Sequence, residues 1–157
     1  MIAGRAGRAM LASALVLAGA ACSSSPGPSS ISVENVRIGA ASAGRAAGVY
    51  GVIRQRGGPD RLVGVEAAAG PLSVMAAGVP MDGAHGAHSD VGLPLAVRPG
   101  SSVVFAPNGM HLMLPASDRA RSVGEVVSLT FRFDRHAPVT VDARVVGLTE
   151  LYDTAGT

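Results

Sequence analysis

Short apolar runs separated by turn residues dominate the chain from residue 31 to residue 146. In Ile31–Ile38 apolar and polar side chains alternate, and this period of two is typical of a strand with one buried face. Glycine and proline separate the runs, and no segment shows a convincing apolar stripe at helical spacing. The pattern predicts eight short strands, at residues 31–38, 49–54, 61–67, 72–75, 101–105, 110–114, 126–133 and 139–146.

Seven or eight short strands at such regular intervals predict an all-β domain, a β-sandwich. Residues 76–94 do not fit this pattern, because they are rich in glycine and lack an apolar face. We expect a long loop there, and long loops in compact domains are often functional or disordered. The sandwich is expected to span residues 31–146, with a C-terminal tail at 147–157.

The first 21 residues have the pattern of a secretory signal peptide. Arg5 and Arg8 give a positive start, and the apolar run after them is too short to cross a bilayer. Small residues then lead to a cleavage site. This pattern predicts secretion across the inner membrane.

Cys22 is the only cysteine and directly follows these small residues, as in a bacterial lipobox, although Gly19 stands where leucine is usual. A lone cysteine in an oxidising compartment calls for an explanation, and lipidation provides one. The alternative is a secreted protein with a free thiol. Residues 22–30 are a polar, flexible tether. We therefore expect a domain that is lipid-anchored in the cell envelope, in the periplasm or on the outer face of the cell membrane.

The charge of the mature chain is balanced. All 13 basic residues are arginine, and the loss of Arg5 and Arg8 leaves 11 of them against 11 acidic residues. No basic cluster is visible, so we expect no nucleic-acid partner. No GxSxG motif is present and no further cysteine could act as a nucleophile, so we expect no enzyme.

Methionine and histidine gather in one part of the chain. Thioether and imidazole suit copper, especially Cu(I). Methionine is also a common core filler, but the strands on either side of this region contain none. The cluster consists of Met75, Met81, His85, His88, Met110, His111 and Met113.

The segment HLML predicts two faces, because side chains alternate along a strand. Met110, Leu112 and Leu114 form the natural core face. His111 and Met113 then share the other face, where both can bind one ion. We expect these two residues to be metal ligands and Met110 to belong to the core.

The upstream candidates leave alternatives open. His85 and His88 form an HxxH pair that could bind copper or zinc, or could belong to a solvent-exposed polar loop. Met75 ends a predicted strand and is either core or ligand. Met81 lies in the predicted loop, where core packing is less plausible.

Several segments in series resemble the PCuAC family of periplasmic copper chaperones. They are residues 47–54, 57–65, 97–101, 107–114 with its HxM motif, and 124–133. The resemblance runs from residue 31 to residue 146. It implies a cupredoxin-like, Greek-key sandwich that carries Cu(I) and passes it by ligand exchange towards the dinuclear copper site of cytochrome oxidase.

The family's copper motif is a histidine, ten residues, a methionine, twenty-one residues and HxM. His111 and Met113 match its second half. Its upstream half departs, because the methionine position falls on Ser89, and Met75 stands where the first histidine is expected. Met75 and His88 are the expected substitutes, with His85 and Met81 as further candidates.

This departure leaves two points open. Two histidines in the loop would favour Cu(II) more than the family does. The expected copper partner is the copper subunit of cytochrome oxidase or another copper chaperone. The alternative function is that of a surface lipoprotein sandwich that binds another protein and has a degenerate copper site.

Overall fold

The computed structural model describes residues 30–77 and 88–153, which form one hydrogen-bonded sheet of eleven strands and a short helix. The elements are β1 (Ser30–Gly39), β2 (Ala47–Arg56), β3 (Asp60–Ala67), β4 (Gly70–Pro71), β5 (Ser73–Ala77), β6 (His88–Asp90), β7 (Leu95–Val97), β8 (Ser102–Phe105), β9 (His111–Leu114), β10 (Val126–Phe133), β11 (Val139–Val146) and α1 (Leu148–Asp153). The strand order is β4-β3-β10-β11-β1-β2-β9-β5-β6, while β7 pairs with β3 and β8 pairs with β2.

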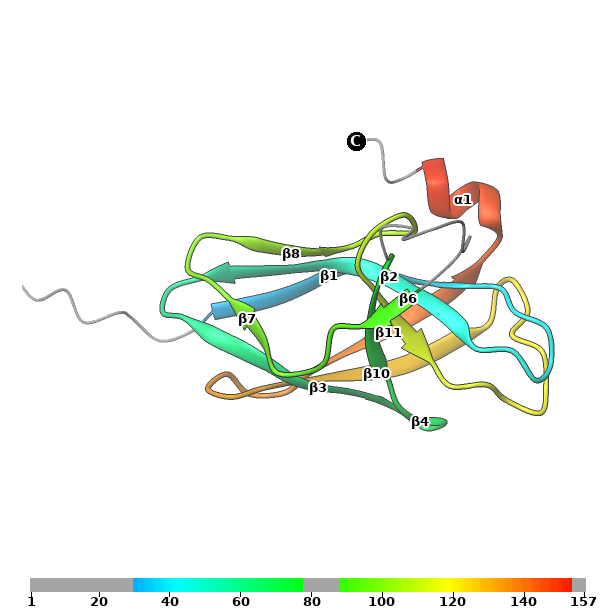
Figure 1. The fold of residues 1–157 in the computed structure, drawn as a ribbon, viewed down its shortest axis with the longest axis horizontal. Helices are drawn as coiled ribbons and strands as arrows, with labels where there is room; N and C mark the ends of the chain where they lie inside the picture. Colours follow the sequence, from blue (N-terminus) through cyan, green and yellow to red (C-terminus); the bar gives the residue numbers. More distant parts are fainter. Residues whose placement is uncertain (1–29, 78–87, 154–157) are drawn as a thin grey trace, which may run out of the picture.

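The sheet folds over on itself, so that β1, β2 and β8 lie above β3 and β10 (Figure 1). The first and last strands, β1 and β11, pair in parallel, and the remaining strand pairs are antiparallel. The predicted all-β, cupredoxin-like sandwich is therefore confirmed.

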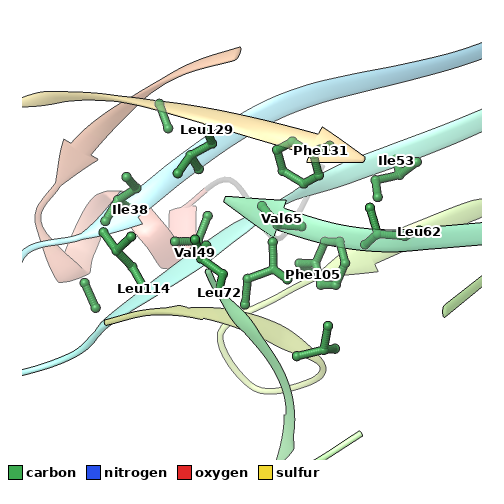
Figure 2. Close-up of a cluster of buried hydrophobic side chains, with 14 of the residues drawn as sticks. Ile38, Val49, Ile53, Leu62, Val65, Leu72, Phe105, Leu114, Leu129 and Phe131 are labelled. Atoms are coloured by element: carbon green, nitrogen blue, oxygen red, sulfur yellow. The ribbon is translucent and has the colours of Figure 1, made fainter. Parts of the chain in front are cut away.

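Side chains from both layers meet in one core (Figure 2). Ile53 and Phe105 come from the upper layer, and Leu62, Val65 and Phe131 come from the lower one; all five are buried. Full burial of such a side chain stabilises the fold by about 1.5–3 kcal/mol. Because the inner faces of the strands pack in this core, their opposite faces point outward.

A bulge in β1 determines which of its residues face outward. Ile31 and Ile38 are both buried in the core, although a regular strand would place an odd and an even position on opposite faces. The register shifts between Glu34 and Arg37, and Asn35 adopts a positive φ of 54°, a conformation that asparagine tolerates. The bulge thereby turns Arg37 to the outer face, opposite Tyr50 of β2.

All eight predicted strands are present, and three short strands were missed. One of them, β6, lies within residues 76–94. The prediction that this whole segment is a loop was wrong for residues 76–77, which belong to β5, and for residues 88–90, which form β6. A strand of two or three residues is too short to show a period in the sequence. The signal peptide, Cys22 and the tether up to residue 29 lie outside the described residues.

The helix α1 was also missed, and it lies in the predicted C-terminal tail. Its six residues are too few for a helical stripe, and among residues 148–152 Leu151 alone is buried. In the part of the chain that the structure describes, no helix has the length and apolar character needed to cross a membrane.

Asp60 ties the start of β3 to the turn between β10 and β11. The residue is 4% exposed, and its carboxylate accepts hydrogen bonds from the backbone N–H groups of Arg61 (2.7 Å), Arg135 (3.0 Å) and His136 (2.9 Å). We expect Asp60→Ala to lower the free energy of unfolding by about 2–4 kcal/mol, because these donors lose a charged acceptor. Urea denaturation measures this loss. The exposed neighbour Asp134 is the control, and an equal effect of Asp134→Ala would contradict the prediction.

Candidate metal centre

The segment HLML forms β9, which lies between β2 and β5 in the sheet. Leu112 and Leu114 are buried in the core together with Val74, the residue opposite Leu112 on β5. His111 and Met113 alternate with these leucines and therefore occupy the other face. The predicted two-faced pattern of this strand is confirmed.

Met75 joins His111 and Met113 on that face. In the antiparallel pair of β5 and β9, Met75 lies directly opposite His111, and Ser73 lies opposite Met113. Directly opposite residues of such a pair share a face and have Cβ atoms about 4.5–5.5 Å apart. The structure thus brings together three of the predicted ligands, and Met75 and Met113 are both half-buried.

His111 is held in a defined orientation. It is 3% exposed, and its Nδ1 lies 3.0 Å from the carbonyl oxygen of Gly109. A carbonyl only accepts, so Nδ1 carries the hydrogen, and Nε2 of the neutral ring carries the lone pair. Metal-binding histidines are commonly oriented by a hydrogen bond of this kind.

The turn between β8 and β9 supplies this carbonyl. The N–H of Gly109 donates to the oxygen of Ala106 (3.1 Å), and the N–H of Ala106 donates to the oxygen of Met110 (2.8 Å). Met110 is half-buried and packs against the core, so its predicted core role is confirmed.

Tyr50 forms a wall beside these residues. Its ring centroid lies 6.1 Å from that of His111, at an interplanar angle of 40°. Its ring also lies across Gly48, the residue opposite Met113 on β2, because a Cβ atom at Gly48 would lie only 2.2 Å from the Tyr50 hydroxyl oxygen. The sequence analysis missed this residue. The available signal was a glycine inside a strand, which often marks a close approach of another group.

The helix α1 brings Leu151 close to Tyr50. A Cβ atom at Gly39 would lie 3.2 Å from Cδ1 of the buried Leu151 and 3.9 Å from Cε2 of Tyr50, so both side chains border the space above Gly39. Burial raises the pKa of the Tyr50 hydroxyl, and the nearby Tyr152 raises it further. The phenol therefore stays protonated and neutral at physiological pH.

A groove with a volume of about 550 Å³ opens on the same face, on the other side of Tyr50. Tyr50 and Leu151 line it together with Arg37 and Arg54. Arg54 is paired with Glu34 at 2.9 Å. Tyr50 thus lies between this groove, which is lined by two arginines, and the proposed ligands His111, Met75 and Met113.

The strand β6 extends the candidate site away from Tyr50. Asp90 lies opposite Met75, and its Oδ1 accepts a hydrogen bond from the N–H of Gly92 at 2.8 Å. The backbone register places His88 opposite Ala77. Met81 and His85 lie outside the described residues, and their roles remain predictions, as does the role of the His88 side chain.

The donors that the register places on this face are the His111 imidazole, the Met75 and Met113 thioethers and, opposite Met75, the Asp90 carboxylate. The two thioethers and the imidazole suit Cu(I) better than harder divalent ions. Within residues 30–77 and 88–153, no group of three or more histidine, cysteine, aspartate and glutamate side chains is arranged to hold a metal ion.

Solved structures with the same fold are PCuAC domains. The "Copper-bound PCuAC domain from PmoF2" is 27% identical, with a TM-score of 0.60, and the match covers 78% of this chain and 96% of that one. The "apo PmoF2 PCuAC domain" is 29% identical, with a TM-score of 0.58, and covers 78% and 93%. The "Apo PCuAC domain from PmoF1" is 23% identical, with a TM-score of 0.58 and coverages of 74% and 93%, and supports the fold alone.

These matches define the class of protein as a PCuAC-type β domain and confirm the resemblance drawn from the sequence. A family model described as "Putative lipoprotein LpqE-like" matches residues 31–145. The chain belongs to the LpqE-like family. A search of curated proteins returned no match.

Proposed function

We propose that this protein is an envelope copper-binding protein, a chaperone that carries Cu(I) as its cargo. In this proposal His111 supplies the Nε2 nitrogen, and Met113 and Met75 supply thioether sulfurs. His88 is the proposed fourth ligand, from the register position opposite Ala77. His85 and Met81 remain further candidates.

The cross-strand register of Met75 and His111 is the observation that supports this function most directly. The two residues are distant in sequence, yet they share a face with Met113. The related domain from PmoF2, at 27% identity, is described as copper-bound, which supports the same cargo for this chain.

We propose that the ion is bound and released by ligand exchange, without catalysis. Thioethers are neutral donors, so their exchange needs no proton transfer. Met75 and Met113 are half-buried, which leaves them accessible to the ligands of an acceptor. Two soft sulfurs to one imidazole favour Cu(I) over Cu(II) among these donors.

The proposed location is the cell envelope, with lipid on Cys22 holding the domain near a membrane. The description of the family as lipoproteins supports this anchor. The proposed acceptor is the copper subunit of cytochrome oxidase or another copper chaperone, and a membrane-anchored donor would remain close to such a membrane-bound acceptor.

An anaerobic Cu(I) titration against a chromophoric chelator tests this function. We would use residues 23–157, which contain every described element and omit the Cys22 thiol, itself a Cu(I) ligand. We expect one equivalent of Cu(I) per chain. Met75→Leu and Met113→Leu keep the volume and apolar character of each side chain but remove sulfur, so each should lower the affinity by at least about 10-fold.

Met110→Leu is the matched control. Met110 packs against the core, so this variant should bind Cu(I) as the unaltered chain does. If the unaltered chain takes up no more Cu(I) than a Met75→Leu/Met113→Leu double variant, the site does not bind copper. The alternative would then stand, a surface lipoprotein sandwich that acts as a protein-binding module with a degenerate copper site.

A further inference from the structure

We propose that Tyr50 is a positioning residue of the copper site and that the C-terminal helix α1 holds it in place. Its ring would restrain the His111 imidazole and cover the site on the β2 side. This inference rests on the copper-binding function proposed above.

The Tyr50 ring lies next to two of the proposed ligands, His111 and Met113. Tyr50 contacts the His111 ring, with 6.1 Å between the centroids. It also fills the space above Gly48, the residue opposite Met113. The cross-strand neighbours of Met113 are both small, Gly48 on β2 and Ser73 on β5, and the Tyr50 ring occupies the space over Gly48.

Neighbouring residues restrict the Tyr50 ring to this position. A tyrosine on an outward face could turn into solvent, but the buried Leu151 of α1 lies beside Gly39 and lines the same groove as Tyr50, which limits the space into which the ring could turn. Gly39 and Gly48 lack the Cβ atoms that would collide with Leu151 and Tyr50. Gly39, Gly48 and Leu151 therefore keep the Tyr50 phenol over β2.

A fixed Tyr50 ring on the β2 side would restrict the direction from which the copper ion is exchanged. With the Tyr50 ring over the β2 side, the ion and its acceptor would approach from the β5 side, next to the half-buried Met75. Loss of the wall should free the imidazole and open a second route for release. Outer-shell partners of metal ligands typically contribute about 10- to 100-fold to affinity.

Two variants of residues 23–157 remove the wall in different ways. Tyr50→Leu removes the ring, and Gly48→Ala leaves Tyr50 unchanged but places a methyl group where its hydroxyl lies. We expect each to weaken Cu(I) binding by about 10- to 100-fold and to speed Cu(I) transfer to a chelator correspondingly. Gly64→Ala is the matched glycine control, because its Cβ atom would meet Arg132 at an ordinary 3.8 Å in a strand outside the site.

Two further measurements separate positioning from a general loss of stability. The chain has no tryptophan and only two tyrosines. In a Tyr152→Phe background Tyr50 is thus the single fluorophore, and Cu(I) should quench it. In the metal-free protein, the NMR shifts of the His111 ring should change in Gly48→Ala and stay unchanged in Gly64→Ala, because the ring current of Tyr50 acts on His111.

The outcomes distinguish the two proposals. If the unaltered chain binds Cu(I), and Gly48→Ala and Tyr50→Leu bind and release it at the unaltered affinity and rate, the positioning role is overturned and the copper function stands. If the unaltered chain binds no Cu(I), the copper function fails and the positioning role fails with it. Unchanged His111 shifts in Gly48→Ala would overturn the positioning role with or without copper.

Discussion

His111→Asn is expected to remove tight Cu(I) binding and leave the protein folded. The asparagine amide can take the place of Nδ1 and donate to the Gly109 carbonyl, while it offers no nitrogen lone pair at the position of Nε2. Loss of a direct ligand should exceed the effect of losing an outer-shell partner, so we expect the affinity to fall by more than about 100-fold. The chelator titration measures this change.

The stability of the metal-free protein is the control for this variant. Asparagine keeps one hydrogen bond but is smaller than this buried side chain, so the free energy of unfolding should fall by about 0.5–3 kcal/mol. His136→Asn is the matched substitution, since this half-buried histidine lies in the turn between β10 and β11, remote in the sheet order from β9. Equal Cu(I) affinity for the two variants would show that His111 is not a ligand.

The faces of β9 could be predicted from the sequence alone. Leu112 and Leu114 are apolar and two residues apart, so a strand that buries them must turn His111 and Met113 to the other face. The burial of both leucines confirms this reasoning. Such alternation can be read from the sequence in most folds, because the choice of buried face determines which residues of the whole strand point inward and which point outward.

The residues of neighbouring strands that share the outer face of β9 could not be predicted from the sequence. Whether Met75 lies opposite His111 depends on the register of two strands that are distant in sequence, and residue spacing alone does not define it. The sequence therefore left Met75 open between core and ligand, and the register favours the outward face. The short strand β6 and the six-residue helix α1 were missed for another reason, because neither is long enough to show a period of apolar residues.

Tyr50 shows a third limit of the sequence analysis. The alternating pattern of β2 places Tyr50 and Gly48 on one face, but it does not show that the ring turns back over the glycine. That direction depends on α1, an element missed for its shortness. The position of the Tyr50 ring thus depends on tertiary packing, and the sequence signals it through Gly48, a glycine inside a strand.

Leu112→Ala is expected to cause the largest loss of stability among the substitutions considered. Leu112 is 1% exposed and belongs to the core, so its truncation removes buried apolar surface and leaves a cavity. Such changes cost about 3–5 kcal/mol. Leu148→Ala makes the same chemical change at a residue that is 68% exposed and should alter the free energy of unfolding by about 0.5 kcal/mol at most. Urea denaturation of both variants gives the comparison.

Copper should restore part of this loss, and this connects the core to the site. Leu112 lies between His111 and Met113 in β9, so the strand that it anchors is the one that presents both proposed ligands. A ligand that binds only the folded state stabilises it by about 2.7 kcal/mol at a free concentration 100 times its dissociation constant. We expect Leu112→Ala to gain stability with Cu(I) and Leu112→Ala/His111→Asn to gain none. An equal gain in both would mean that the ion binds elsewhere on the chain.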